Sequence, residues 1–444
     1  METRTYRSGK AVQELAVTPA ENLLCAVHER FHADGMIVIA ASVQGVIDAN
    51  LLEQAFRALQ RRHPRLRACI VKRRQRFYEV CEAPPPIPLE TVDGSFGDED
   101  VANFALRLHA SGIPLDAAPM ARAVLLRDTY GRRSSVLLAA PHAVLDGISA
   151  KRVLADLFGY YRVVKASDNR HAAVDRIESL PLLAPSSAPL NLSRCQAALL
   201  MCRLMRDRVR KRLTRCTPVP ETSRPDPRYR EITLSDEETR KFLRICKVRG
   251  CGVYGAVAAV GMTALRDALG VSSPTFSYRC PIDMRNILQG ADGPVGDLHV
   301  GCFLSAFESA VRLPAQDDFW ELAGAMRNEV AAFVRSQGPS LIYNILRLFR
   351  VKDIRFVPRR GTIAVNSLGV VDTGSDCDGV LWDGFKAFPK WRELGPYVGL
   401  LSFTVRGRLT IAVGTAVVRE DVWRRFAERV AELVRAVSQD RHCG

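Results

Sequence analysis

The residues best suited to chemistry form one short segment, Pro141-His142-Ala143-Val144-Leu145-Asp146-Gly147, an H-x-x-x-D-G motif. It directly follows the apolar run 136–140, which is typical of a buried strand, and precedes a helical pattern at 149–161. Because imidazole has an unperturbed pKa of about 6.5, a histidine can take a proton from a hydroxyl or an amine near neutral pH. Strand ends before glycine-containing turns commonly present catalytic side chains. The motif therefore predicts His142 as a general base.

The alternative for His142 taken alone is a structural or capping histidine, and the strand–turn–helix context favours the catalytic interpretation. Residues 171–175 repeat the H-x-x-x-D spacing. They lack the glycine and follow the polar residues 168–170, so we assign His171 no role.

A glycine-rich segment, Gly250-Cys251-Gly252-Val253-Tyr254-Gly255, matches the G-x-G-x-x-G pattern of dinucleotide-binding loops. Such a site requires a strand before the first glycine. Here the preceding residues, 235–246, have the pattern of a capped helix. We therefore predict a glycine turn between two helices rather than a nucleotide site.

Composition and cysteine spacing narrow the class of protein. With 47% hydrophobic and 25% charged residues, the chain is not disordered, collagenous or a disulfide scaffold. The 12 cysteines contain no C-x-x-C pair, which predicts reduced, mostly buried thiols and no metal site. Residues 1–10 do not resemble a secretory signal, and no apolar stretch reaches the about 18–20 residues of a membrane-spanning helix. We expect a cytoplasmic, monomeric protein.

Two stretches of alternating strand and helix patterns make up most of the 444 residues. The first is predicted to contain strands at 35–43, 66–71, 77–81, 120–126 and 134–140 and helices at 47–62 and 149–161. The second is predicted to contain helices at 235–248, 253–269, 317–335 and 420–438 and strands at 274–282, 299–307, 362–371, 398–406 and 409–417. Together they predict two α/β halves of similar size.

A Pro-rich and then basic connector joins the two halves. Residues 180–190 hold three prolines, and residues 194–216 hold eight Lys/Arg and one acid in a chain whose formal net charge is +15. The positive charge indicates an anionic partner. Nucleic acid is disfavoured because the basic stretch has no aromatic residue and its charges surround the helix. A solvated face, an acidic carrier protein, a phosphorylated cofactor and a peripheral membrane contact remain open.

Several further segments resemble one family, and they occur in its order. They are Arg62-His63-Pro64-Arg65-Leu66-Arg67, residues 114–122, Cys280-Pro281-Ile282-Asp283-Met284-Arg285 and Val365-Asn366-Ser367-Leu368-Gly369. With the H-x-x-x-D-G motif they resemble the acyltransferase superfamily of condensation domains, polyketide-associated acyltransferases and alcohol acetyltransferases. The resemblance implies an α/β (α+β two-lobe) fold, with two chloramphenicol-acetyltransferase-like lobes and a tunnel between them. We place the N-terminal lobe at 1–176, the connector at 177–226 and the C-terminal lobe at 227–444.

The resemblance also implies a role for each matching residue. His142 would act as the general base, with no acyl-enzyme intermediate. Asp146 would point away from the substrate and form an ion pair with Arg285, and Gly147 would allow close backbone approach at the turn. Asn366 and Ser367 would lie near the tunnel and help to stabilise the oxyanion.

The chain also departs from the family patterns. Condensation domains usually carry a second histidine before the catalytic one, where this chain has Pro141. That difference favours ester formation over amide formation. Asn366 and Ser367 are inverted relative to the usual order. The D-F-G-W-G loop of plant-type members is absent, although Trp382-Asp383-Gly384-Phe385 lies in a comparable place.

The expected function is therefore transfer of an acyl group from a CoA or acyl-carrier-protein thioester to a small-molecule hydroxyl, in secondary-metabolite or lipid biosynthesis. The thioester is a substrate, and no bound cofactor is expected. Any carrier protein would act in trans. Two alternatives remain: an amide-forming enzyme of a nonribosomal pathway, and a non-catalytic module that docks a carrier protein.

Overall fold

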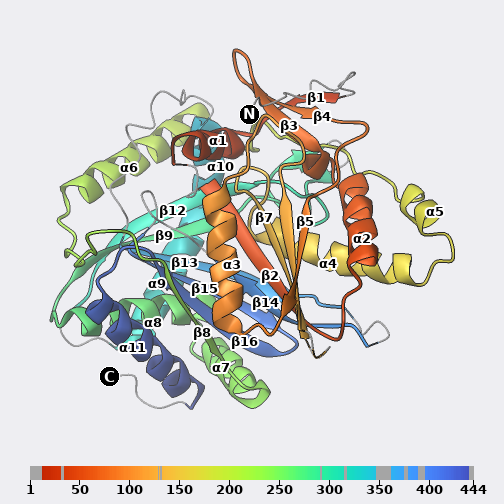
Figure 1. Ribbon diagram of the computed structural model, residues 1–444. Coiled ribbons are helices and arrows are strands. Elements are labelled where there is room, and N and C mark those ends of the chain that lie inside the picture. The colour runs from red at the N-terminus through yellow and green to blue at the C-terminus, as the bar shows by residue number, and fades with distance from the viewer. Residues whose placement is uncertain are drawn as a thin grey trace.

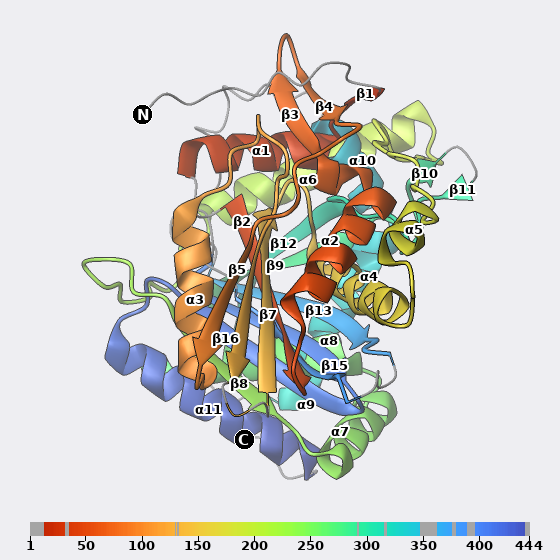
Figure 2. The same ribbon diagram turned by 45° about the vertical axis from the view of Figure 1, so that its right-hand side comes forward.

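The computed structural model describes residues 13–31, 35–128, 130, 133–290, 293–314, 318–346, 362–374, 379–388 and 396–439. Two main sheets, each packed against helices, make up most of the structure (Figures 1 and 2). The C-terminal helix α11 (Glu420–Ser438) lies on the outer side of the second sheet, far from the three-stranded sheet near the N-terminal end.

The first sheet carries the H-x-x-x-D-G motif at the end of its central strand. Its five strands have the order β14-β2-β7-β6-β5. Helices α2 and α4 lie together on one side of it and α3 on the other (Figure 2). The bounds are β2 (Met36–Gln44), β5 (Leu89–Gly94), β6 (Arg122–Asp128), β7 (Arg133–Pro141), β14 (Leu381–Ala387), α2 (Ala49–Arg62), α3 (Asp98–Ser111) and α4 (Gly147–Lys165).

The second sheet has six strands in the order β12-β9-β13-β15-β16-β8, in which β13 runs parallel to both of its neighbours. Helices α8, α9 and α11 pack together, and α8 contacts β13 and β15. The bounds are β8 (Arg228–Thr233), β9 (Thr275–Asp283), β12 (Leu304–Arg312), β13 (Ile363–Val371), β15 (Val398–Val405), β16 (Arg408–Thr415), α7 (Asp236–Val248), α8 (Gly252–Leu269), α9 (Phe319–Arg335) and α10 (Gly338–Leu346).

The remaining elements lie around these sheets. They include a three-stranded sheet in the order β1-β4-β3 and a two-stranded sheet of β10 and β11. Their bounds are β1 (Gln13–Ala16), β3 (Ala68–Lys72), β4 (Arg76–Val80), β10 (Gln289–Gly290), β11 (Gly293–Pro294), α1 (Pro19–Phe31), α5 (Arg170–Asp175) and α6 (Arg194–Leu213).

Strand β14 comes from the C-terminal half of the sequence but completes the first sheet. It pairs antiparallel with β2, from Leu381 opposite Gln44 to Ala387 opposite Ile39. Its Trp382 stacks on Phe158 of α4, with ring centroids 5.2 Å apart. The predicted boundaries at 176/177 and 226/227 stay predictions, and β14 shows that the second half of the chain also builds the first sheet.

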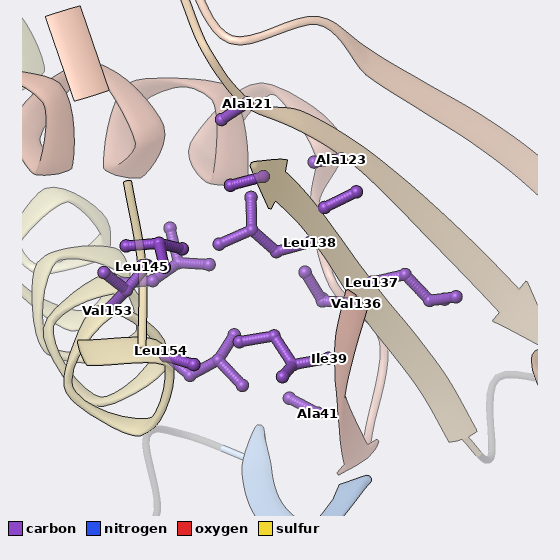
Figure 3. Packing of buried hydrophobic residues seen from close by; sticks show 14 of the residues in the cluster. Ile39, Ala41, Ala121, Ala123, Val136, Leu137, Leu138, Leu145, Val153 and Leu154 are labelled. Carbon is purple, nitrogen blue, oxygen red and sulfur yellow. The ribbon is translucent and has the colours of Figure 1, made fainter. Parts of the chain in front are cut away.

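Two large hydrophobic cores lie against the main sheets, and the first core also includes residues of β13, β15 and β16 from the second sheet. The first core is formed between the sheet and α4, where Val153 and Leu154 meet Leu138 and Ile39 (Figure 3). Leu145, within the H-x-x-x-D-G motif, is 1% exposed and belongs to the same cluster. The motif turn is therefore anchored by apolar packing as well as by hydrogen bonds.

The ends of some elements differ from the predicted ones. The predicted strand at 66–71 begins as a 3-10 helix, Pro64–Arg67, because proline starts such a turn and keeps His63 extended. The predicted strand at 299–307 occupies Leu304–Arg312 instead. The predicted glycine turn is confirmed: α7 ends at Val248, Gly250 has a φ of 66°, and α8 begins at Gly252.

Two further expectations concern thiols and membranes. The ten described cysteines are free, and Cys25, Cys246, Cys251, Cys280 and Cys302 are buried. Half of the described cysteines are thus buried, whereas the cysteine spacing predicted that most would be. Within the described ranges, no single helix has the length and hydropathy to cross a membrane; α7 and α8 pass such a test only as a pair bent by 99°.

Candidate active site

The motif turn begins where β7 ends. Pro141 is the last residue of the strand and lies opposite Met36, and the backbone N–H of His142 donates to the carbonyl of Gly35 at 2.6 Å. The backbone N–H of Val144 then donates to the carbonyl of Pro141 at 2.8 Å, which closes a tight turn. Helix α4 starts immediately afterwards, at Gly147. The turn therefore fixes the backbone of His142 between a buried strand and a helix.

His142 is half-buried as a residue. Its Nδ1 is buried and has no hydrogen-bond partner within the described residues. Burial lowers the pKa of His142, and the nearby carbonyls of His142 and Leu145 and the carboxylate of Asp146 oppose this only in part. The imidazole is therefore neutral at neutral pH, in the form that can accept a proton.

Asp146 is the N-cap of α4, and its carboxylate points away from His142 into the protein. Its Oδ1 accepts from Ser149 N–H and from Arg285 Nη2, both at 2.8 Å, and its Oδ2 accepts from Phe303 N–H at 3.0 Å. The side chain is fully buried. Burial alone would raise the pKa of Asp146, but the charge of Arg285 and these hydrogen bonds outweigh it and lower the pKa.

Arg285 is also fully buried and is held from several sides. Nη2 donates to Asp146 and to Ser149 Oγ at 2.7 Å, and Nη1 donates to Asp283 Oδ1 at 2.9 Å. The guanidinium lies over the ring of Phe303, 5.0 Å from its centroid. Arg285 lies two residues after the end of β9 of the second sheet, so the Asp146–Arg285 ion pair links the two sheets at the motif.

Residues 300–303, which we call the crossing segment, come from the second half of the sequence and lie against the motif. Asp146 N–H donates to the Gly301 carbonyl at 3.1 Å. Ser149 Oγ donates to the same carbonyl at 2.7 Å and accepts from Gly301 N–H at 2.9 Å. Ser149 is thereby fully satisfied, because a hydroxyl offers one donor and two acceptor positions. These bonds explain why the predicted strand at 299–307 starts only at Leu304.

Gly147 lies where α4 meets the β-bulge of β13. A Cβ placed on Gly147 would come within 2.5 Å of Leu368 Cδ2, and Leu368 is 5% exposed. Nearby, Lys151 Nζ donates to the carbonyls of Leu368 at 2.8 Å and of Val370 at 3.2 Å. The first turns of α4 therefore contact β13 as well as the crossing segment.

We expect Gly147→Ala to lower the free energy of unfolding by about 1–3 kcal/mol, because the added methyl overpacks a buried contact. Shortening Leu368 removes the clash. The double variant Gly147→Ala/Leu368→Ala should therefore be destabilised by clearly less than the sum of the two single changes. Chemical denaturation of the four proteins measures this. Additive losses would show that the close approach to Leu368 is not the reason for glycine.

Asn366 and Ser367 precede this bulge on β13. Asn366 is half-buried, its carbonyl accepts from Ser402 Oγ at 3.5 Å, and Ser367 is exposed. In the described part of the chain, neither side chain has a hydrogen bond to the motif. The structure thus brings together His142, Asp146, Gly147 and Arg285, whereas the oxyanion role of Asn366 and Ser367 stays a prediction.

The sequence interpretation overlooked Ser149. It occupies the third position of α4 after an Asp N-cap, a spacing that indicates a capping arrangement. A local pattern could therefore have drawn attention to it. Its contacts with Gly301 and Arg285 could not be read from local patterns, because they join residues 152 and 136 positions apart.

An H-E-x-x-H sequence, whose absence from the chain the sequence interpretation took to disfavour a zinc protease, is in fact present: residues 28–32 read His-Glu-Arg-Phe-His. His28 is 5% exposed and its Nε2 is 2.8 Å from the Ile113 carbonyl. Glu29 pairs with Arg76 at 2.7 Å; burial alone would raise the pKa of Glu29, but the hydrogen bond and charge of Arg76 outweigh it and lower the pKa. His32 lies outside the described residues. Among those that are described, no group of three His, Cys, Asp or Glu could hold a metal.

Two family models match this chain, one in each half. The condensation domain matches residues 31–173, which include the motif, and the phthiocerol/phthiodiolone dimycocerosyl transferase C-terminus matches residues 223–414, which include Arg285. The chain belongs to the condensation and acyltransferase superfamily. Members of this superfamily are therefore the relatives with which both halves of the chain, including the motif, can be compared.

Solved structures of this superfamily have the same fold along nearly the whole chain. Trichothecene 15-O-acetyltransferase from Fusarium sporotrichioides is 14% identical, with a TM-score of 0.76 over 96% of this chain and 97% of the other. The first condensation domain of the CDA synthetase is 15% identical, with a TM-score of 0.68 over 98% of both chains. Polyketide synthase associated protein 5 from Mycobacterium tuberculosis is 16% identical, with a TM-score of 0.66 over 97% of this chain and 98% of the other. The predicted fold of two chloramphenicol-acetyltransferase-like lobes is thus confirmed.

Among curated proteins, the chain is similar to chondramide synthase cmdD of Chondromyces crocatus, with 32% identity over 140 residues. That alignment covers 30% of this chain and 3% of the synthase. The chain therefore corresponds to a small part of a much longer relative.

Proposed function

We propose that this protein is an O-acyltransferase that moves an acyl group from a CoA or acyl-carrier-protein thioester to a hydroxyl. The observation that carries the proposal is the state of His142: a half-buried histidine with a lowered pKa, fixed in a tight turn, whose Nδ1 has no hydrogen-bond partner within the described residues. The Asp146–Arg285 ion pair holds the adjoining turn. These features suit a fixed neutral base at the meeting point of two lobes.

The proposed step needs one proton acceptor and no covalent intermediate. Nε2 of His142 takes the proton of the acceptor hydroxyl as its oxygen attacks the thioester carbonyl. The carbonyl reforms as the carbon–sulfur bond breaks, and the departing thiolate takes the proton from His142. The products are an ester and a free thiol, and His142 returns to its neutral state.

Two observations favour a hydroxyl over an amine acceptor. Pro141 occupies the position before His142 where condensation domains usually carry a second histidine. The structure with the TM-score of 0.76 is that of an enzyme named as an O-acetyltransferase. The amide-forming alternative rests on the condensation-domain match and on the local similarity to chondramide synthase.

A panel of acyl thioesters and acceptors tests the proposal. We expect ester products, detected by mass spectrometry, and a higher kcat/KM with alcohols than with the corresponding amines. A preference for amines would support amide formation instead. Complete inertness of the folded protein together with tight binding of a carrier protein would establish a non-catalytic docking module.

The formal net charge of +15 supports an anionic donor group, such as the phosphates of CoA or the surface of an acidic carrier protein. Comparing acyl-CoA with the same acyl group on a carrier protein, at low and high salt, distinguishes the two donors. We also propose a cytoplasmic, monomeric enzyme, as expected from the sequence.

The dependence of kcat/KM on pH gives a separate prediction. Since burial lowers the pKa of His142, the base is already neutral below its ordinary value of about 6.5. Activity should fall only as the pH drops through this lowered pKa, so the acid limb should have its inflection below about pH 6.5 and a plateau above it. Initial rates between about pH 5 and pH 8 measure this. An inflection above pH 6.5 would contradict a neutral, desolvated His142.

A further inference from the structure

A second buried ion pair joins helix α1 to the 3-10 helix Pro64–Arg67. Glu21 is 0% and Arg65 2% exposed, and Arg65 Nε and Nη2 lie 3.1 and 2.8 Å from Glu21 Oε1. The Arg65 guanidinium lies over Tyr78, 5.0 Å from its ring centroid. Two charges buried this completely are costly to separate, because removing one leaves the other without a partner.

The same two side chains bind the crossing segment. Arg65 Nη1 donates to the Val300 carbonyl at 2.8 Å, and Cys302 N–H donates to Glu21 Oε1 at 3.3 Å. Thr18 Oγ1 donates to the Cys302 carbonyl at 3.5 Å. The Glu21–Arg65 pair thus holds residues 300 and 302, whereas Asp146 binds residues 301 and 303 of the same segment.

Close packing leaves the crossing segment little freedom between the two ion pairs. The guanidinium carbons of Arg65 and Arg285 are 5.2 and 5.0 Å from the centroid of the Phe303 ring. A Cβ on Gly301 would lie 2.7 Å from that ring and 2.9 Å from Arg65 Cζ. A shift of Arg65 would therefore be transmitted to Gly301 and Phe303, which contact Asp146 directly.

We infer that Glu21 and Arg65 are positioning residues, which hold the crossing segment against Asp146 and thereby set the position of His142. The inference rests on the acyl transfer proposed above. Neither residue needs to touch a substrate. A displacement of about 1 Å at a reacting group can lower a rate by about 10²-fold, so loss of the pair should appear in kcat rather than in KM.

The kinetic test uses Glu21→Gln, Arg65→Met and the double variant. We expect each single change to lower kcat by about 10–100-fold, with KM within about twofold of wild type. Removing both charges leaves no unpaired charge, so the double variant should regain much of the lost Tm but not the lost kcat. Recovery of kcat together with Tm, or an unchanged kcat in Glu21→Gln, would overturn the inference.

The exposed Glu90–Arg107 pair of the same lobe, with its atoms 3.1 Å apart, provides the matched control. Glu90→Gln should change neither kcat nor Tm.

If wild type transfers no acyl group from any thioester, the proposed function fails, and the inference is then tested by the Tm values of the variants alone. The losses in Glu21→Gln and Asp146→Asn should then be non-additive, because both act on residues 300–303. Additive losses would overturn it.

Discussion

His142→Ala is expected to lower kcat for acyl transfer by about 10²–10⁴-fold, the contribution of a well-placed general base. KM should change little, because the base acts on the acceptor proton in the transition state. Steady-state kinetics with the best thioester and alcohol pair measure both constants. Equal turnover by His142→Ala and wild type would show that His142 is not the base.

The same substitution should leave the fold intact. Nδ1 of His142 has no hydrogen-bond partner within the described residues, and His142 is only half-buried. We therefore expect the free energy of unfolding to change by about 1 kcal/mol or less. A large loss of stability would mean that the histidine is structural.

His171 gives a matched control for this prediction. It has the same H-x-x-x-D spacing as the motif but lies exposed on the short helix α5. His171→Ala should retain full activity, because the spacing alone does not create a base. An effect of comparable size at His171 would point to a general sensitivity of the fold to histidine removal.

Much of the motif could be predicted because its structure is local. A buried strand, a tight turn and a helix follow one another within residues 133–165, and each has its own sequence pattern. Asp146 has the side chain that caps a helix, and Gly147 follows it directly. These features depend on residues that are close together in the sequence, so local sequence patterns predict them.

The crossing segment and β14 could not be predicted in this way. Residues 300–303 look like the start of a strand, and their apolar pattern says nothing of Arg65 or Asp146, which lie more than 150 positions earlier. Likewise, Leu381–Ala387 is separated from its partner strand β2 by most of the chain. Such pairings are decided by packing between distant segments, and periodicity alone does not record them.

The start of α4 emerges as the joint between the two lobes. Asp146 reaches Arg285 and Phe303, Ser149 reaches Gly301, and Lys151 reaches the bulge of β13. Every contact comes from the residues that immediately follow the base. Changes at this joint are therefore expected to affect stability and catalysis together, whereas a change at His142 affects catalysis alone.

Breaking the Asp146–Arg285 ion pair is the second change with a large expected effect, in this case on the free energy of unfolding. Arg285→Met should lower the free energy of unfolding by about 3–5 kcal/mol, because it leaves the Asp146 carboxylate buried without its cation. Asp146→Asn should cost less, about 1–3 kcal/mol, since Arg285 keeps Asp283 at 2.9 Å and asparagine can still cap α4. Urea denaturation measures both losses. Losses no greater than that of His142→Ala would refute this division of roles.

The double variant Asp146→Asn/Arg285→Met measures how far the losses of stability in the two single variants depend on each other. With both charges gone, no fully buried ion is left without a partner, and Asp283, which also loses its cation, is partly exposed, so the loss should be smaller than the sum of the two single losses. Activity should nevertheless stay low, because the crossing segment has lost its bond to an anionic cap. A double variant as unstable as the sum would indicate that the two side chains act independently.

The pH dependence of the free energy of unfolding tests whether the charged Asp146 carboxylate stabilises the fold. The pKa of Asp146 in the folded protein is lowered below its ordinary value of about 3.9, so its carboxylate stabilises the fold fully above about pH 4. That contribution is lost as the pH falls through the lowered pKa. Burial raises the pKa of Asp283, but Asp283 is present in both proteins and largely cancels in the comparison. The gap in stability between wild type and Asp146→Asn should therefore be constant near neutral pH and narrow only below about pH 4.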